Sequence, residues 1–208
     1  MKTLLTSASL SLLLIVSAGA QERSHVAFNI GAGFTEPVGH TGRVTDMGWN
    51  VGAGVGYNFN PYVGLLVDAN YSSFGINSTT LANVGAPGGG FHIFSATLDP
   101  IIHIAPKSHA DVYITGGGGI YHRNQDLTAP ATAITTGFDP FFGFFPVAVS
   151  TNQVLASYTV NKPGVDIGMG IAFGSKWHGK FFAEAKYNRI FMRDSHTDYV
   201  PVTFGFRW

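Results

Sequence analysis

The chain has 208 residues with 12 Lys or Arg and 12 Asp or Glu, so its formal net charge is zero and no basic surface for nucleic acid is expected. Charged residues make up only 12% of the chain, about half the usual share for a soluble domain. Aromatic residues reach 13%, and Gly numbers 27. The absence of Cys excludes disulfides, thiolate metal sites and a lipid-modified N-terminal cysteine.

The N-terminus has the features of a secretory signal peptide. Lys2 is followed by an apolar stretch, residues 4–16, and then by the small residues 17–20. We expect cleavage after Ala20, so that residues 1–20 are the signal peptide and residues 21–208 the mature domain. A transmembrane helix is the alternative, but the apolar run is shorter than the roughly 20 residues that span a bilayer.

After this segment, apolar residues recur with a period of two, which indicates strands with one apolar face. In the first strand, residues 26–34, Val26, Phe28 and Ile30 alternate with small or polar residues. The same alternation recurs in the segments 49–59, 63–72, 94–104, 112–123, 166–173, 181–188 and 200–208. No helical periodicity is found between them. The sequence therefore predicts eight strands.

Two strands contain residues that disturb this pattern. Pro100 interrupts the fourth strand and predicts a bulge or a bend there. Four consecutive glycines, residues 116–119, leave the facing of the fifth strand undecided.

The connections alternate in length. Short turns are expected near Asn60, Lys107 and Trp177, and mostly longer links at 35–48, 75–90, 124–162 and 193–199. In bacterial outer-membrane barrels the periplasmic turns are short and the extracellular loops long. With an even number of strands, both termini are therefore expected on the periplasmic side and the long links outside the cell.

These features predict an all-β fold, an eight-stranded antiparallel up-and-down transmembrane β-barrel. An unpaired N–H or C=O in hydrocarbon costs several kcal/mol, so a sheet that spans lipid must close on itself. A soluble lipocalin-like barrel is the alternative, but it would carry its apolar face inside and show more charge outside.

The polar faces of the strands place charges of both signs inside such a barrel. The expected inward set is Asp68, Asp99, Asp166, Glu184, Lys186 and Arg207. Because buried charges need partners, we expect a network of ion pairs and hydrogen bonds that plugs the lumen instead of an open channel. On this basis Glu184→Ala is expected to destabilise the barrel, since a lumen cation would lose its partner.

The eight alternating strands and the C-terminal pattern of Phe204, Phe206 and Trp208 resemble the outer-membrane β-barrel superfamily typified by outer membrane proteins A and X. The resemblance covers residues 26–208. It implies that the barrel-assembly machinery reads the C-terminal aromatic strand, and that lipid and lipopolysaccharide of the bacterial outer membrane surround the protein. Unlike outer membrane protein A, the chain ends at the barrel, so anchoring to the cell wall is not expected. We expect a monomer without a cofactor.

The link between the fifth and sixth strands concentrates aromatic residues with a single charge. They are Phe138, Phe141, Phe142, Phe144 and Phe145. An exposed apolar patch in a long loop often marks an interaction site. Alternatively, these rings join the aromatic girdle or fold over the barrel mouth. Residues 154–160 alternate again, which favours an extension of the two strands beyond the membrane as a hairpin.

Other motifs lack the context that their chemistry requires. The Gly-rich segments 52–56 and 116–119 do not open a helix, so phosphate binding is not expected. Ser195, His196 and Asp198 are neighbours in a short loop, where relay geometry is rare. The His residues show no i,i+4 pairing that would predict a metal site, and they are scattered at His25, His40, His92, His103, His109, His122, His178 and His196.

Three classes of function fit these features. The leading one is a structural or interaction barrel that supports envelope integrity and presents its loops outward. A narrow porin-like or apolar-solute transport barrel is the second, and the predicted charged plug argues against it. A lipid-modifying barrel enzyme is the third, but the sequence has no convincing pair of Ser and His for the lipid-facing rim. We therefore do not expect an enzyme.

Overall fold

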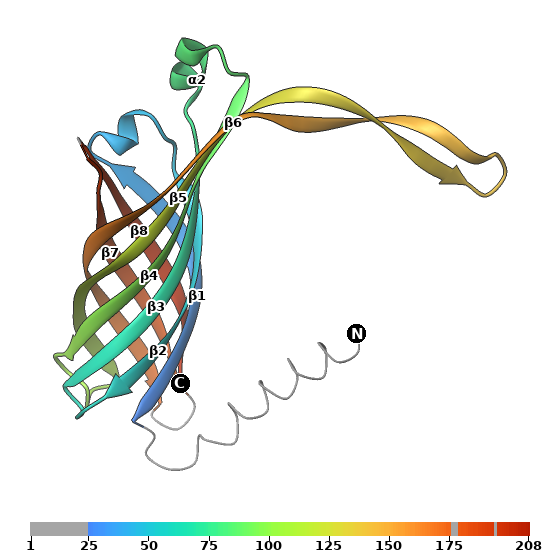
Figure 1. Ribbon diagram of the computed structural model, residues 1–208. Helices are drawn as coiled ribbons and strands as arrows, with labels where there is room; N and C mark the ends of the chain where they lie inside the picture. The colour runs from blue at the N-terminus through green and yellow to red at the C-terminus, as the bar shows by residue number, and fades with distance from the viewer. Residues whose placement is uncertain (1–24, 176–178, 194) are drawn as a thin grey trace.

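The computed structural model describes residues 25–175, 179–193 and 195–208. Its eight strands form one closed antiparallel barrel in which sequential strands pair and the last pairs with the first (Figure 1). The predicted all-β up-and-down barrel is confirmed. The strands are β1 (Val26–Val38), β2 (Gly48–Asn58), β3 (Val63–Gly75), β4 (Gly88–His103), β5 (Ala110–Asp139), β6 (Gly143–Ser175), β7 (Gly179–Phe191) and β8 (His196–Arg207).

The barrel closes between β1 and β8. Phe28 donates its N–H to the carbonyl of Trp208 at 2.9 Å and accepts from the Trp208 N–H at 3.0 Å. The two strands stay in register as far as the pair Val38 and Asp198. Every strand of the barrel wall therefore has two neighbours, which is the condition for a sheet to span hydrocarbon.

The two faces of the wall differ as predicted. Outward side chains such as Val67, Ile167 and Phe181 are 58%, 62% and 70% exposed, whereas the inward Asp99 and Asp166 are buried. On β5, Tyr113 and Tyr121 are also buried, so the odd-numbered residues face inward through the glycine run. The apolar surface is therefore on the outside, and the soluble lipocalin-like arrangement is excluded.

The bulge predicted at Pro100 is absent. β4 keeps one register with β3 across Pro100, which lies opposite Leu65. Toward β5, the pairs Leu98–Gly118 and Ile101–Thr115 on either side of Pro100 also share one register. Because proline lacks only its own N–H, the ladder tolerates a local gap there without an extra residue.

Two short helices occupy links for which no helical periodicity was found. They are the 3₁₀ helix η1 (Thr41–Arg43) between β1 and β2, and α2 (Ser78–Val84) between β3 and β4. α2 begins after Asn77, whose Oδ1 accepts the Thr80 N–H at 2.8 Å, and ends at Gly85 with φ 66°. A helix this short shows little periodicity, and its sequence signals are these caps. Among the described residues, no helix is long and apolar enough to cross a membrane.

The connections separate the barrel into two ends. The start of β1, the end of β8 and the links 59–62 and 104–109 lie at one end, which we call the turn end (Figure 1). η1, α2 and the β5–β6 connection lie at the opposite end, the loop end. The turn predicted near Trp177 and the signal peptide predicted for residues 1–20 lie outside the described residues.

β5 and β6 continue far beyond the barrel as a twisted two-stranded ribbon (Figure 1). β4 pairs with β5 only as far as Thr128, and β7 pairs with β6 only from Gly164. We call the ribbon between these points, residues 129–163, the arm. Its strands join through residues 140–142 alone. The predicted extension as a hairpin is therefore confirmed, and most of the expected long link is strand.

Candidate functional site

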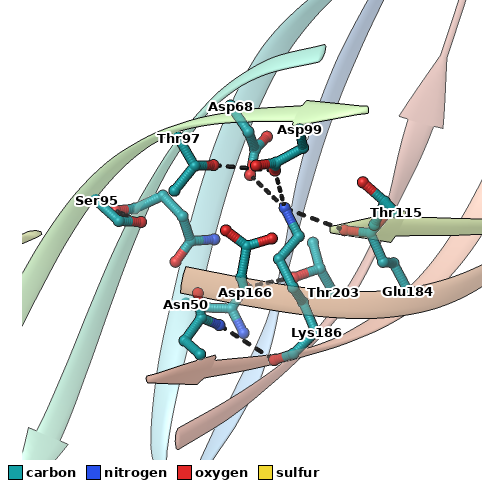
Figure 2. A network of polar contacts seen from close by, with 12 residues as sticks. Asn50, Asp68, Ser95, Thr97, Asp99, Thr115, Asp166, Glu184, Lys186 and Thr203 are labelled. Atoms are coloured by element: carbon teal, nitrogen blue, oxygen red, sulfur yellow. Dashed lines mark hydrogen bonds and ion pairs between the residues drawn. The ribbon is translucent and has the colours of Figure 1, made fainter. Parts of the chain in front are cut away.

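Lys186 lies at the centre of the lumen. Its side chain is 7% exposed, and its Nζ is 2.8 Å from Oδ2 of Asp99 and 3.3 Å from Oδ2 of Asp68. Glu184, two residues away on the same strand, is more distant, with Oε1 at 3.9 Å. Figure 2 shows the amine between these carboxylates. The ion pairs connect β7 to β3 and β4, which are not its neighbours in the wall, so they brace the barrel across its interior.

Asp166 joins this network through a tyrosine. The hydroxyl of the fully buried Tyr121 donates toward Asn188 Oδ1 at 3.0 Å and toward Asp166 Oδ2 at 3.4 Å. The amide of Asn188 in turn donates to the Lys186 carbonyl at 3.1 Å. The network therefore contains neutral groups, which the charged residues of the sequence did not indicate.

Asn50 makes a second polar contact inside the barrel. Its Nδ2 donates to the Phe34 carbonyl at 2.7 Å, and its Oδ1 accepts from the Thr203 hydroxyl at 2.8 Å. Asn50 therefore links β2 to β1 and β8, on both sides of the seam where the barrel closes. In the sequence, the only signal for this contact was the position of Asn50 on the glycine-rich face of the second predicted strand.

Apolar clusters lie above and below the polar centre. The cluster toward the loop end consists of Phe74, Ile76, Phe91, Ile93, Tyr121, Ile190 and Tyr199. The cluster toward the turn end consists of Ile101, Tyr113, Ala172 and Phe182. A cavity of about 30 Å³ remains beside Lys186, Glu184 and Asn188, which is room for about one water molecule. Apolar side chains therefore fill the lumen on both sides of the polar centre.

The five phenylalanines singled out in the sequence lie at the end of the arm. Phe141, Phe142 and Phe144 are 92%, 87% and 78% exposed, and Phe138 contacts Phe144 with ring centroids 5.1 Å apart. The alternative that these rings join the girdle or cover the barrel mouth is wrong, because the ribbon carries them away from the wall (Figure 1). We call residues 138–146 the arm tip.

The sequence profile of the outer membrane protein beta-barrel domain matches residues 7–207. The chain belongs to this family. Membership places this outer-membrane barrel in the bacterial outer membrane, as the resemblance implied.

Two solved structures share the fold of this outer-membrane barrel. Neisserial surface protein A is 13% identical with a TM-score of 0.56, and the match covers 88% of this chain and 96% of that chain. Ail of Yersinia pestis, solved with the heparin analogue sucrose octasulfate, is 16% identical with a TM-score of 0.51, over 88% of this chain and 97% of that chain. No curated protein sequence matches. At these identities the likeness shows the fold alone.

Arg207 does not join the Lys186 network of this outer-membrane barrel. It lies opposite Lys180, near the turn end, and its guanidinium stacks over Tyr113 and Phe182 at 4.6 and 5.3 Å from the ring centroids. Arg123 stacks similarly over Phe91 at 4.6 Å toward the loop end. Each apolar cluster therefore carries an arginine on an aromatic face, an arrangement that favours the cation.

A second ion-pair group of the barrel, around Asp111, was not identified from the sequence. His103 Nδ1 lies 2.7 Å and Lys180 Nζ 3.5 Å from Asp111 Oδ2. Asp111 is the second residue of β5 and follows a predicted turn. Too few alternating residues precede it for the sequence to show whether its side chain faces inward or outward.

The Ser195, His196 and Asp198 segment has another role in this barrel. Asp198 accepts from Arg189 through both carboxylate oxygens, at 2.9 and 3.0 Å, while His196 lies 3.3 Å away. Within the described residues, no hydrogen bond joins the Ser195 hydroxyl to His196. No group of three His, Asp or Glu suited to a metal ion is found in the described part of the chain.

The C-terminal residues of the barrel form an aromatic group at the turn end. The ring centroids of Phe206 lie 5.4 Å from Phe181 and 5.7 Å from Trp208, and Trp208 stacks on Phe28 at 6.1 Å. Phe204 points outward and is 54% exposed. Their reading by the barrel-assembly machinery stays a prediction.

Proposed function

We propose that this barrel is a non-conducting structural and interaction protein of the outer membrane, and that the arm is its interacting element. The observation that carries the proposal is the filled lumen. Ions crossing it would have to displace both the Lys186 network and two layers of apolar side chains. The cavity of about 30 Å³ beside Lys186 is too small for a water column.

We propose that the loop end faces the outside of the cell and that both ends of the mature chain face the periplasm. At the loop end the links 39–47 and 76–87 and the arm are longer than the turn-end links 59–62 and 104–109, which supports this orientation, although the β7–β8 link, residues 192–195, is short. The predicted signal peptide is consistent with it.

Recording conductance in planar bilayers tests the closed lumen. We expect the mature chain, residues 21–208, to insert without stepwise conductance. Phe182→Ala, which shortens the turn-end cluster but leaves the Lys186 ion pairs, serves as the matched variant and is expected to stay closed as well. Reproducible single-channel steps from the wild-type protein would replace this proposal with the transport alternative.

We do not propose that the arm binds a sulfated ligand such as the one in the Ail structure. A polyanion is bound by Lys and Arg, and the arm contains one cation, Lys162 at its root, with Asp139 as its other charged side chain. The arm is therefore suited to an apolar partner. Its chemistry also does not support the lipid-modifying alternative, which needs a nucleophile and a base close together.

A further inference from the structure

We propose that the arm tip is a lipid anchor that inserts Phe141 and Phe142 into the outer leaflet beside the barrel. The inference rests on the proposed function in one respect, since it requires the loop end to lie outside the cell. It names lipid as the partner of the arm.

The arm tip holds its exposed rings in a defined turn. Asp139 Oδ1 accepts the N–H groups of Phe141 and Phe142 at 2.8 and 3.1 Å. Gly143 completes the turn with φ +75°, a conformation that other residues rarely adopt. The N–H groups next to the two most exposed rings are therefore already bonded, so insertion of these rings would not leave those two donors unpaired in an apolar phase.

The composition of the arm favours lipid over a protein partner. Protein interfaces depend on Trp, Tyr and Arg at their energetic centres, and the arm tip contains none of these. It contains Phe, Pro and Gly with one carboxylate, so little polar surface would lose its hydration on insertion. The arm tip has no Lys or Arg, so its insertion needs no anionic lipid.

The ribbon needs a partner surface for its own order. Among the described residues, neither strand of the arm has a neighbour at its outer edge, because β4 and β7 pair only within the barrel. Apolar side chains remain exposed along both strands, among them Ile134 at 78% and Leu155 at 57%. A lone two-stranded ribbon is marginally stable in water, so contact with a surface would stabilise it.

The direction of the arm places its tip over lipid. In Figure 1 the ribbon leaves the loop end sideways, across the barrel axis, and does not continue upward along that axis. Residues 129–139 extend the ribbon by about 35 Å. Because the barrel is fixed in the same membrane, the arm meets lipid at a high effective concentration, and a soluble partner does not have this advantage.

Site-specific fluorescence tests the anchor, and the absence of Cys makes single labels possible. The full mature chain carrying Phe142→Cys is labelled with bimane and reconstituted into phosphatidylcholine vesicles. Quenching is measured with spin-labelled lipid and, separately, with iodide in the water. Thr79→Cys, on the exposed side of α2, is the matched control, and heat-dependent gel migration verifies that both variants fold.

We expect the label at position 142 to lose most of its fluorescence to spin-labelled lipid and to resist iodide, with the reverse at position 79. Adding Phe141→Ser and Phe144→Ser should abolish the difference between the two positions. Equal quenching by iodide at both positions, without quenching by lipid, would overturn the anchor.

Protection from iodide without quenching by lipid would also overturn it, and would point to a protein partner. If that protection disappears when vesicles hold one barrel each, the partner is a second copy. In either case the proposed interaction role of the barrel is unaffected. The proposal of a closed lumen would be contradicted only by conductance in planar bilayers. The two proposals can therefore fail separately.

Discussion

At the residue level, Lys186 is surrounded by more carboxylates than one ammonium group can neutralise. Asp68, Asp99 and Glu184 lie within 4.0 Å of its Nζ, and Asp166 approaches the same network through Tyr121. Removing the cation from a buried group of this kind leaves uncompensated negative charge. Lys186 is therefore the residue on which the charge balance of the lumen depends.

Lys186→Met is expected to lower the free energy of unfolding by about 3 kcal/mol or more, because the buried carboxylates lose their cation. Urea unfolding in detergent micelles measures the change. Lys180→Met is the matched control near the turn end, where the side chain is 19% exposed and Asp111 keeps His103, so we expect a smaller loss. A Lys186→Met variant as stable as the wild type would mean that the carboxylates are not charged in the folded state.

The geometry also changes the expectation for Glu184→Ala. Glu184 is the most distant of the three carboxylates, and Lys186 keeps Asp68 and Asp99 without it. We now expect this variant to lose less stability than Lys186→Met in the same unfolding experiment. A larger loss would show that Glu184 has a role that its distance does not indicate.

The close approach of β1 and β8 leads to a second prediction about a single residue. A Cβ at Gly33 would overlap the carbonyl oxygen of Val202 on β8, whereas a Cβ at Gly56 would lie 3.5 Å from its nearest neighbour, the carbonyl oxygen of Leu65. Gly33→Ala is therefore expected to destabilise the barrel by about 1–3 kcal/mol. Gly56→Ala is the control and should cost much less under the same conditions. Equal losses would exclude crowding at the seam as the cause.

At the level of elements, the loop end is organised by its caps. Asn77 accepts from Thr80 to begin α2, and its Nδ2 donates to the Arg43 carbonyl at 2.7 Å, which ties the β3–β4 link to the β1–β2 link. Asn77→Ala is expected to cost about 1 kcal/mol locally. Faster hydrogen exchange at Thr80, with unchanged exchange in β3, would demonstrate this. Unchanged exchange at Thr80 would count against the cap.

The arm lies outside the hydrogen-bonded ladder of the barrel. Beyond Thr128 and Val154, which pair with each other, the ribbon contacts only itself in the ladder. Replacing residues 129–153 with Asn-Gly is expected to close β5 and β6 with a two-residue turn and to leave barrel unfolding unchanged. If the shortened protein no longer folds, the arm takes part in assembly of the barrel.

At the level of the whole molecule, closure and an apolar outer wall determine behaviour in solution. We expect the mature chain to require detergent, and to migrate differently on gels before and after boiling, because heating unfolds the closed sheet. A mature chain that is folded and monomeric in plain buffer would contradict the outward assignment of residues such as Ile167 and Phe181.

The residues by themselves determined the number of strands, their faces and the fold class. An alternating pattern is local, so the sequence of each strand shows which of its side chains face inward and which face outward. This alternation alone placed five charged residues inside the barrel: Asp68, Asp99, Asp166, Glu184 and Lys186. The caps of α2 and the facing of Asp111 were missed because each depends on a few residues at the edge of an element.

Only the tertiary structure decided which inward residues meet. Lys186 reaches Asp68 and Asp99 because closure brings β7 opposite β3 and β4 at one height, whereas Arg207 lies nearer the turn end beside Tyr113. The stagger of the strands around the whole barrel sets these heights, and no single strand encodes it. The arm also depends on more than one strand. β5 and β6 become a free ribbon at the points where β4 and β7 stop pairing with them.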